Sequence, residues 1–182
     1  MSFIQAPSPN FDARVRPPDM IVLHYTGMPT GEAALAKMCD PAAKVSAHYM
    51  VEEDGRIFSL VPDERRAWHA GPSKYEGREK VNDFSIGIEL VNAQTGRDPF
   101  TDAQYQSLIL LTTDLVARHG IPLERIMGHR EITNFPKIKR DPADNFDWKR
   151  YLDGVKATVE THQVRRLVQD AKTGKIAKEA GL

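Results

Sequence analysis

The chain has 182 residues, of which 41% are apolar and 27% are charged, values typical of one globular domain with a buried core. Lys and Arg together number 25, as do Asp and Glu, so the net charge of zero gives no reason to expect nucleic acid or an anionic membrane as a partner. The single cysteine, Cys39, excludes an internal disulfide and a cysteine-rich zinc site.

The first segment, residues 1–19, is rich in proline and is predicted to be an extended arm that leads into the fold. It has neither the basic start nor the apolar stretch of a signal peptide. No stretch of the chain is apolar for long enough to span a bilayer. We therefore expect a cytoplasmic protein without a membrane span, and release by a route that needs no signal peptide is the alternative.

Four apolar runs are predicted to be β-strands. Residues 20–24 (MIVLH) and 85–91 (SIGIELV) are almost continuously apolar, which favours buried, central strands. Residues 47–52 and 56–60 flank the dipeptide Asp54-Gly55, which is typical of a tight β-hairpin.

Helices are predicted at residues 31–39, 102–119 and 147–160. The second has the clearest boundaries, because Thr101 and Gln104 match a capping box and a Gly-Ile-Pro stretch follows it.

The two remaining segments are less regular. Residues 123–145 are predicted to be a long functional loop, and the Lys-rich residues from about 160 to 182 a docked or partly frayed terminal helix. Strands and helices alternate without repeats, which predicts one α/β domain over residues 1–182 with helices packed on a sheet.

Two histidines and one aspartate are candidate metal ligands. His24 ends a predicted strand, which is where α/β folds place their sites. His129 follows Gly128, which would let the backbone bend and turn the imidazole inward. Asp141 precedes a proline, which restricts its backbone. Taken alone, His24 could be a core histidine, His129 a loop histidine and Asp141 part of a surface ion pair. Together, however, two imidazoles and a carboxylate are a common ligand set for catalytic zinc.

Glu89 and Lys139 are candidates for the chemical step. Glu89 interrupts an apolar strand, where desolvation would raise its pKa towards the range of a general base. Lys139 lies two residues before Asp141, so in an extended segment it would share a face with that residue and could stabilise an oxyanion. The alternatives are a solvent-facing strand residue for Glu89 and a solvated lysine for Lys139, a description that suits Lys137 and Arg140.

Three other side chains are candidates for binding a substrate. Trp68 could form a flat platform for a sugar ring, or it could be a core aromatic that caps the sheet. Lys44 and Lys80 could pair with substrate carboxylates, although isolated lysines are mostly solvated.

Together these residues resemble the zinc-dependent N-acetylmuramoyl-L-alanine amidases of the amidase type 2 family. The resemblance covers about residues 7–149, and the matching stretches follow the order of the family: PSPNFDAR, MIVLHYTG, KVSAHYMVEEDGRIFSLV, RAWHAGPSKYEGRE, NDFSIGIELVN, FTDAQYQSL, MGHREI and KRDP..NFDW. It implies a mixed central β-sheet flanked by helices, as in phage-lysozyme-type amidases and peptidoglycan recognition proteins.

The resemblance also implies roles for the candidate residues. One zinc ion would be held by His24, His129 and Asp141. Glu89 would act as general base, and Lys139 would stabilise the tetrahedral intermediate.

The resemblance implies four residues that contact the substrate. Trp68 and its neighbour Ala67 would line the muramyl pocket. Lys44 and Lys80 stand where basic residues of the family grip the stem peptide, although lysine lacks the bidentate fork of arginine.

Two departures from the phage-type pattern indicate a branch of the family. Phage-type relatives place a catalytic tyrosine one residue before the strand histidine, and this chain has Ala47 there. They also commonly use cysteine as third ligand, whereas Asp141 resembles the bacterial branch that recycles 1,6-anhydro-muropeptides. We therefore expect hydrolysis of the amide between N-acetylmuramic acid and L-alanine in such fragments. A wall-degrading amidase acting on intact peptidoglycan is the alternative, and a zinc peptidase or a non-catalytic peptidoglycan-binding module are rivals from other classes.

Overall fold

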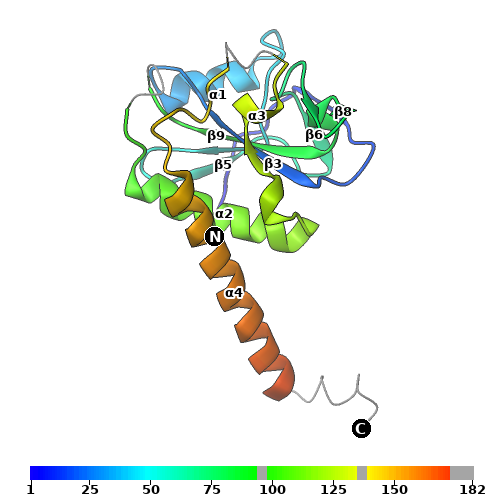
Figure 1. Cartoon of the computed structure of the whole chain (residues 1–182). Coiled ribbons are helices and arrows are strands. Elements are labelled where there is room, and N and C mark those ends of the chain that lie inside the picture. Colours follow the sequence, from blue (N-terminus) through cyan, green and yellow to red (C-terminus); the bar gives the residue numbers. More distant parts are fainter. Residues whose placement is uncertain (94–97, 135–138, 173–182) are drawn as a thin grey trace.

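Two apolar strands lie side by side at the centre of the computed structural model (Figure 1), which describes residues 1–93, 98–134 and 139–172. They are β3 (Met20–Tyr25) and β9 (Ser85–Leu90), which pair in parallel so that His24 lies opposite Glu89. Their apolar side chains are almost entirely buried, as expected for strands that are covered on both faces. The prediction of two central strands is confirmed.

Further strands complete a mixed sheet around this pair. Within the described residues the order is β1-β5-β4-β9-β3-β10, and the added strands are β1 (Ile4–Gln5), β4 (Tyr49–Val51), β5 (Ile57–Ser59) and β10 (Ile126–Gly128). β4 and β5 are antiparallel, as the Asp54-Gly55 turn predicts, and every other neighbouring pair is parallel. The mixed α/β sheet expected from the sequence is therefore confirmed.

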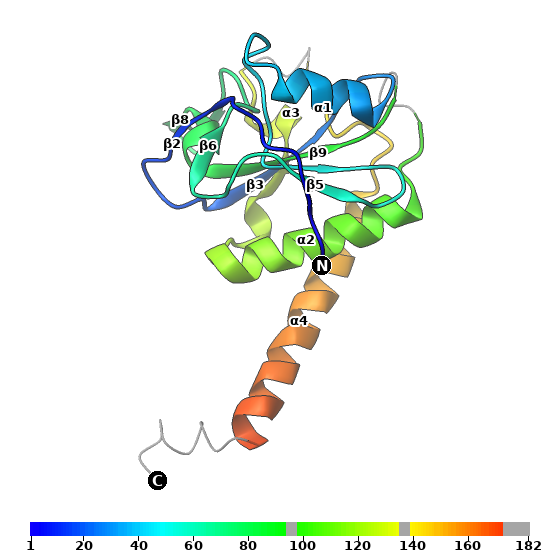
Figure 2. The ribbon, with the colours of Figure 1, turned by 180° about the vertical axis from the view of Figure 1, so that it is seen from behind.

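Helices cover both faces of this sheet, with α1 (Gly31–Cys39) on one side and α2 (Asp102–His119) on the other (Figures 1 and 2). α2 begins in a capping box formed by Thr101 and Gln104, and it ends at Gly120 with a left-handed φ of 65°, both as predicted. The main core fills the space between the sheet and α2, and it includes Leu23, Ile86, Ile88, Leu108, Leu111 and Leu115.

The last helix, α4 (Trp148–Lys172), packs on α2 only through its first turns. Tyr151 is fully buried and its hydroxyl lies 2.7 Å from that of Thr112. Residues 160–169 are exposed, and the helix projects away from the sheet (Figures 1 and 2). Of the two alternatives predicted for the tail, docked or partly frayed, the docked one is wrong for residues 160–169, which are exposed on the projecting helix. Residues 173–182 lie outside the described residues.

Two other segments differ from their predictions. The predicted loop at 123–145 contains a 3₁₀-helix, Leu123–Arg125, then β10 and the short α3 (His129–Ile132). The arm at 1–19 is extended as expected, but it joins two sheets, through β1 and through β2 (Phe11–Ala13).

Smaller elements lie between β5 and β9. β6 (Arg65–Ala67) pairs with β2, and β7 (Lys74–Tyr75) forms a hairpin with β8 (Arg78–Glu79). A 3₁₀-helix, Val81–Asp83, then leads into β9. Among the helices that the structure describes, none combines the length and the apolar character needed to cross a bilayer.

Candidate metal centre

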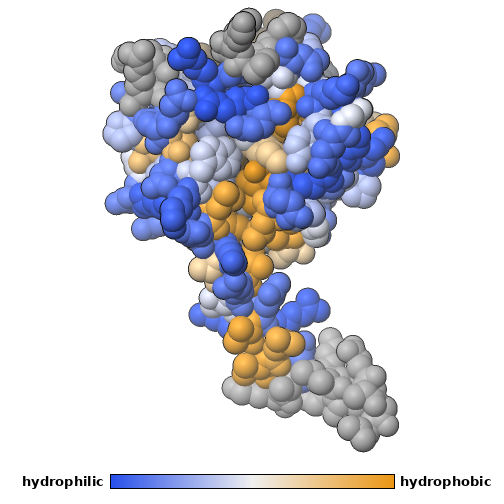
Figure 3. All heavy atoms as spheres, in the orientation of Figure 1, coloured by the Kyte–Doolittle hydropathy of each residue, from blue (hydrophilic) through white to orange (hydrophobic). Residues whose placement is uncertain are grey.

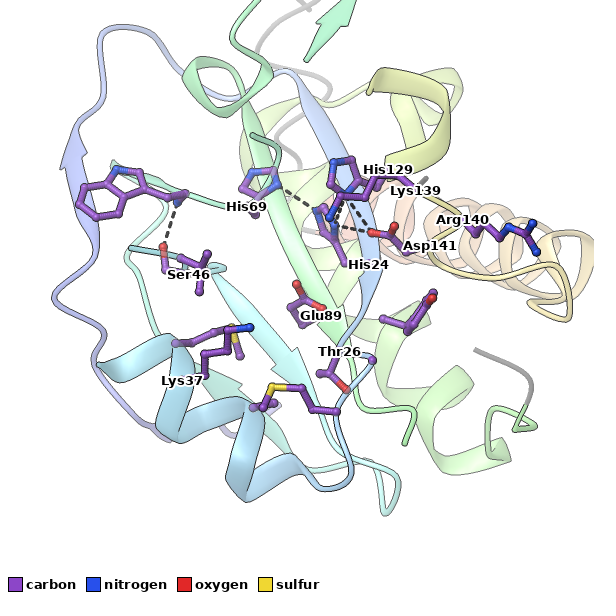
Figure 4. A pocket seen from close by; sticks show the side chains of 17 residues that line it. His24, Thr26, Lys37, Ser46, His69, Glu89, His129, Lys139, Arg140 and Asp141 are labelled. Carbon is purple, nitrogen blue, oxygen red and sulfur yellow. Dashed lines mark hydrogen bonds and ion pairs between the residues drawn. The ribbon is translucent and has the colours of Figure 1, made fainter. Parts of the chain in front are cut away.

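Three side chains converge at the ends of β3 and β10 (Figure 4). His24 is the penultimate residue of β3, and His129 begins α3 directly after the neighbouring strand β10. His24 Nδ1 lies 2.9 Å from Asp141 Oδ2 and 3.1 Å from His129 Nδ1. His129 Nδ1 also lies 2.9 Å from Asp141 Oδ2, and all three residues are buried. The predicted ligand set is thus brought together in space.

Gly128 has a different role from the one that the sequence suggested. Its φ of −86° is ordinary extended backbone, so the prediction of a glycine-specific bend is wrong. A Cβ atom there would lie 2.8 Å from Pro142 Cδ and 3.0 Å from the carbonyl oxygen of Asp141. The missing side chain therefore lets the segment that carries Asp141 lie against the end of β10.

The donor set of this cluster suits a metal ion. Burial lowers the pKa of His24, so its ring is neutral near pH 7. A carboxylate and neutral imidazoles are the ligating forms of these side chains. Tetrahedral zinc with bonds of about 2.0 Å spaces its ligand atoms roughly 3.3 Å apart, close to the separations given above.

Glu89 is a half-buried residue beside this cluster, on the strand that pairs with β3. Its Oε2 atom is buried and has no hydrogen-bond partner among the described residues. Burial and, to a lesser degree, the charge of Asp141 raise the pKa of Glu89 to about 8, while Lys139 and Lys37 oppose the shift. Figure 4 shows the carboxylate at the cavity, next to His24. An unpaired carboxylate with a raised pKa is suited to accept a proton.

The cluster opens into a cavity of about 360 Å³. Trp68 lines one side, with its indole N–H donating to Asp12 Oδ2 at 2.7 Å and its backbone N–H to Ser46 Oγ at 2.9 Å. Lys139 and Arg140 line the cavity beside the candidate metal ligands. The cavity therefore offers an aromatic surface and positive charge close to the candidate metal position.

The other predicted substrate contacts lie outside this cavity. Lys44 and Lys80 are exposed and have left-handed φ values of 52° and 58°. Ala67 is buried in β6. Within the described part of the chain none of the three lines the cavity. Lys137, expected to be a solvated lysine, falls outside the described residues.

Sequence reasoning missed two residues of the site. Lys37 enters the cavity from α1, where Ala34, Lys37 and Met38 form one face of the helix, a spacing that the sequence contains. His69 lies behind His24, with its Nδ1 at 3.0 Å from His24 Nε2. A Cβ atom at Gly87 would overlap the ring of His69. A glycine inside the buried strand β9 was the signal for such a close approach.

Comparisons with known proteins agree with this geometry. A family model for N-acetylmuramoyl-L-alanine amidases (Amidase_2) matches residues 14–144. The 1,6-anhydro-N-acetylmuramyl-L-alanine amidase AmpD of Haemophilus influenzae is 42% identical over an alignment of 172 residues, which covers 84% of this chain and 91% of that protein.

Solved structures show the same similarity. The crystal structure of a selenomethionine AmpD derivative superposes with a TM-score of 0.73 at 38% identity, over 84% of this chain and 94% of that one. A complex of the amidase AmiD from E. coli with the substrate anhydro-N-acetylmuramic acid-L-Ala-D-gamma-Glu-L-Lys superposes with a TM-score of 0.67 at 35% identity, over 79% of this chain and 60% of that one.

Proposed function

Since this chain belongs to the N-acetylmuramoyl-L-alanine amidase family, we propose that it hydrolyses the amide bond between N-acetylmuramic acid and L-alanine in 1,6-anhydro-muropeptides, as part of cell-wall recycling. One observation carries the proposal. The buried cluster of His24, His129 and Asp141 opens into a cavity that also contains the carboxylate of Glu89, whose Oε2 atom has no hydrogen-bond partner among the described residues.

A metal ion and the side chains around it would share the work of catalysis. His24, His129 and Asp141 would hold a zinc ion, which when bound acts as a Lewis acid and lowers the pKa of water. Glu89 takes one proton from the water that attacks the lactyl carbonyl carbon, and it later delivers this proton to the amine of L-alanine as the C–N bond breaks. The products are a free muramyl carboxylate and a free peptide amine, so no further reactant is needed.

The ammonium group of Lys139 serves the same step. Lys139 lines the cavity two residues from Asp141, so its charge can balance the negative charge that develops on the carbonyl oxygen. Its charge also opposes the rise in the pKa of Glu89. Lys139 thus lowers the energy of the tetrahedral species while Glu89 handles the proton.

The cavity wall offers the substrate a sugar platform and cationic groups. Trp68 stacks on the muramyl ring at one side of the cavity, beside the backbone of Ala67. Lys44 and Lys80, which lie exposed outside the cavity, contact stem-peptide carboxylates that extend beyond it. Lysine offers a charge without a fixed geometry at these two positions.

The proposal extends to the organisation and the location of the protein. Residues 1–182 form one amidase domain that works in the cytoplasm, where soluble wall fragments are met. The support for this is the H. influenzae relative, which is matched over 84% of this chain and 91% of its own length.

Substrate choice is the test of this proposal. We expect a higher kcat/KM for a 1,6-anhydro-muropeptide than for its reduced, non-anhydro counterpart, and slow clearing of intact sacculi. Mass spectrometry of the products should show cleavage between the lactyl group and L-alanine, which excludes a peptidase. Equal kcat/KM values with rapid clearing of sacculi would instead establish a wall-degrading amidase on the same catalytic site.

A further inference from the structure

We propose that His69 is a positioning residue that fixes the proton of His24 on Nε2 and so leaves Nδ1 free to bind the metal ion. The proposal rests on the metal site proposed above and adds a residue to it. His69 Nδ1 lies 3.0 Å from His24 Nε2, on the side of the His24 ring that faces away from Asp141 (Figure 4). The two rings meet edge to face, with centroids 5.1 Å apart and planes at 76°.

The hydroxyl group of Ser85 decides which nitrogen of His69 carries the proton. Ser85 Oγ lies 2.7 Å from the carbonyl oxygen of Val81 and 3.1 Å from His69 Nε2. A carbonyl oxygen can only accept, so the hydroxyl hydrogen is directed at Val81 and Oγ is left to accept from His69 Nε2–H. A neutral imidazole has a single N–H, and Nδ1 of His69 is therefore an acceptor.

The same reasoning then fixes the tautomer of His24. The acceptor Nδ1 of His69 is satisfied only when His24 carries its hydrogen on Nε2. Nδ1 of His24 then has a free lone pair, and this is the atom that lies 2.9 Å from Asp141 Oδ2. An imidazole held in one tautomer by its other nitrogen is the usual arrangement at protein metal sites.

His129 is fixed by the residue next to His69. Its Nε2 lies 3.2 Å from the carbonyl oxygen of Ala70, which can only accept, so Nδ1 of His129 is also unprotonated. Asn82 Oδ1 accepts from the backbone N–H groups of both His69 and Ala70, at 3.2 and 2.8 Å. The segment His69–Ala70, held by the side-chain amide of Asn82, therefore orients both His24 and His129.

This assignment leaves three lone-pair atoms facing one another with no proton between them. They are Nδ1 of His24, Nδ1 of His129 and Oδ2 of Asp141, separated by 2.9 to 3.1 Å. Such an arrangement is repulsive unless a cation lies among the three atoms. The hydrogen-bond chain from Val81 to His24 thus prepares the site for a metal ion.

Zinc affinity, measured by competition with a chelator, tests the role of His69. His69→Leu removes the acceptor and should weaken zinc binding about 10–100-fold. His69→Asn should restore most of the affinity, because its side-chain oxygen can occupy the place of Nδ1. Ser85→Ala should also weaken binding, although Ser85 contacts neither His24 nor the ion. Ser107→Ala is the control and should leave the affinity unchanged, since that hydroxyl likewise donates to a carbonyl (Gly55) but belongs to α2 and to no part of this hydrogen-bond chain.

Nitrogen-15 NMR of the zinc-loaded, unmutated protein gives a second readout that does not depend on how the variants fold. We expect His69 and His24 to be protonated on Nε2. A proton on Nδ1 of His69, or unchanged zinc affinity in His69→Leu, would overturn the positioning role and leave the metal site standing. A wild-type protein that binds no zinc would instead refute the metal site, and the role of His69 with it.

Discussion

Glu89 has the surroundings expected of a group that moves a proton. Its Oε2 is buried without a partner among the described residues, and its pKa is raised to about 8. Glu89→Gln keeps the shape of the side chain and removes the base. We expect turnover to fall about 10²–10⁴-fold, while elemental analysis still finds one zinc per chain.

A second variant separates loss of the base from loss of the metal. His129→Ala removes a ligand, so it should lose both zinc and activity. Retention of stoichiometric zinc by His129→Ala would rule out this ligand assignment. If Glu89→Gln stayed within roughly threefold of the wild type, another group would have to take the proton.

Lys139 lines the cavity of the candidate metal cluster, as Lys37 does from α1, and it lies two residues from Asp141. Loss of one oxyanion-stabilising donor typically costs about 10²–10³-fold in turnover, and we expect a loss of that order for Lys139→Ala. The control is Lys149→Ala, because Lys149 is on α4 and pairs with Asp153. Steady-state kinetics with an anhydro-muropeptide measure both. Small, equal effects from the two variants would support a merely solvated Lys139.

Local sequence signals found the candidate metal ligands but not His69, the residue that we propose orients one of them. His24 could be predicted because it ends an apolar strand, and Asp141 because it completes a known ligand set with two histidines. The contact between His24 and His69 joins residues 45 positions apart, and no pattern near either histidine encodes it. Lys37 was missed because the face that α1 turns to the cavity depends on how that helix packs.

β9 combines a central position in the sheet with a glycine that makes room for a functional ring. A Cβ atom at Gly87 would overlap the His69 ring, which is held from behind by Ser85. Gly87→Ala should therefore destabilise the protein by about 1–3 kcal/mol, the usual cost of overpacking. Urea denaturation measures the loss, and zinc binding should weaken in the same variant because the ring is displaced.

Gly154 on α4 is the matched control for this substitution. A Cβ atom there would meet the Cδ1 atom of Ile109, the far end of a flexible side chain that can move aside. Alanine also favours a helix over glycine by about 1 kcal/mol. Gly154→Ala should consequently be close to neutral. Equal stabilities of Gly87→Ala and the wild type would show that His69 is not confined by β9.

Elements with a complete local signal could be predicted, and elements that depend on distant partners could not. α2 has a capping box at one end and Gly120 at the other, so both boundaries are encoded nearby. β10 has only three residues, and it becomes a strand by pairing with β3 about a hundred positions earlier in the chain. β6 is a charged RRA stretch that is extended because β2 pairs with it.

The whole molecule is a domain with a helix that extends beyond it (Figure 2). Much of the domain surface in view is hydrophilic, while the distal part of α4 shows an apolar patch (Figure 3) that includes Val164, Leu167 and Val168. These three side chains are between 48% and 60% exposed, so they contribute little to the core. The sequence could predict that this segment is helical, but its lack of contact with the domain depends on the direction in which α4 leaves α2.

Truncation after Glu160 tests how independent the domain is of the projecting part of α4. Residues 161–169 are exposed, and changes of exposed residues usually alter stability by no more than about 0.5 kcal/mol. We therefore expect the shortened protein to keep its free energy of unfolding, its zinc and its kcat/KM. Tyr151→Ala in the retained turns is the contrast, because that fully buried ring packs on α2 and its loss should cost roughly 3–5 kcal/mol. Destabilisation of the truncated protein by several kcal/mol would mean that the distal helix folds back on the domain, which is the docked alternative of the sequence analysis.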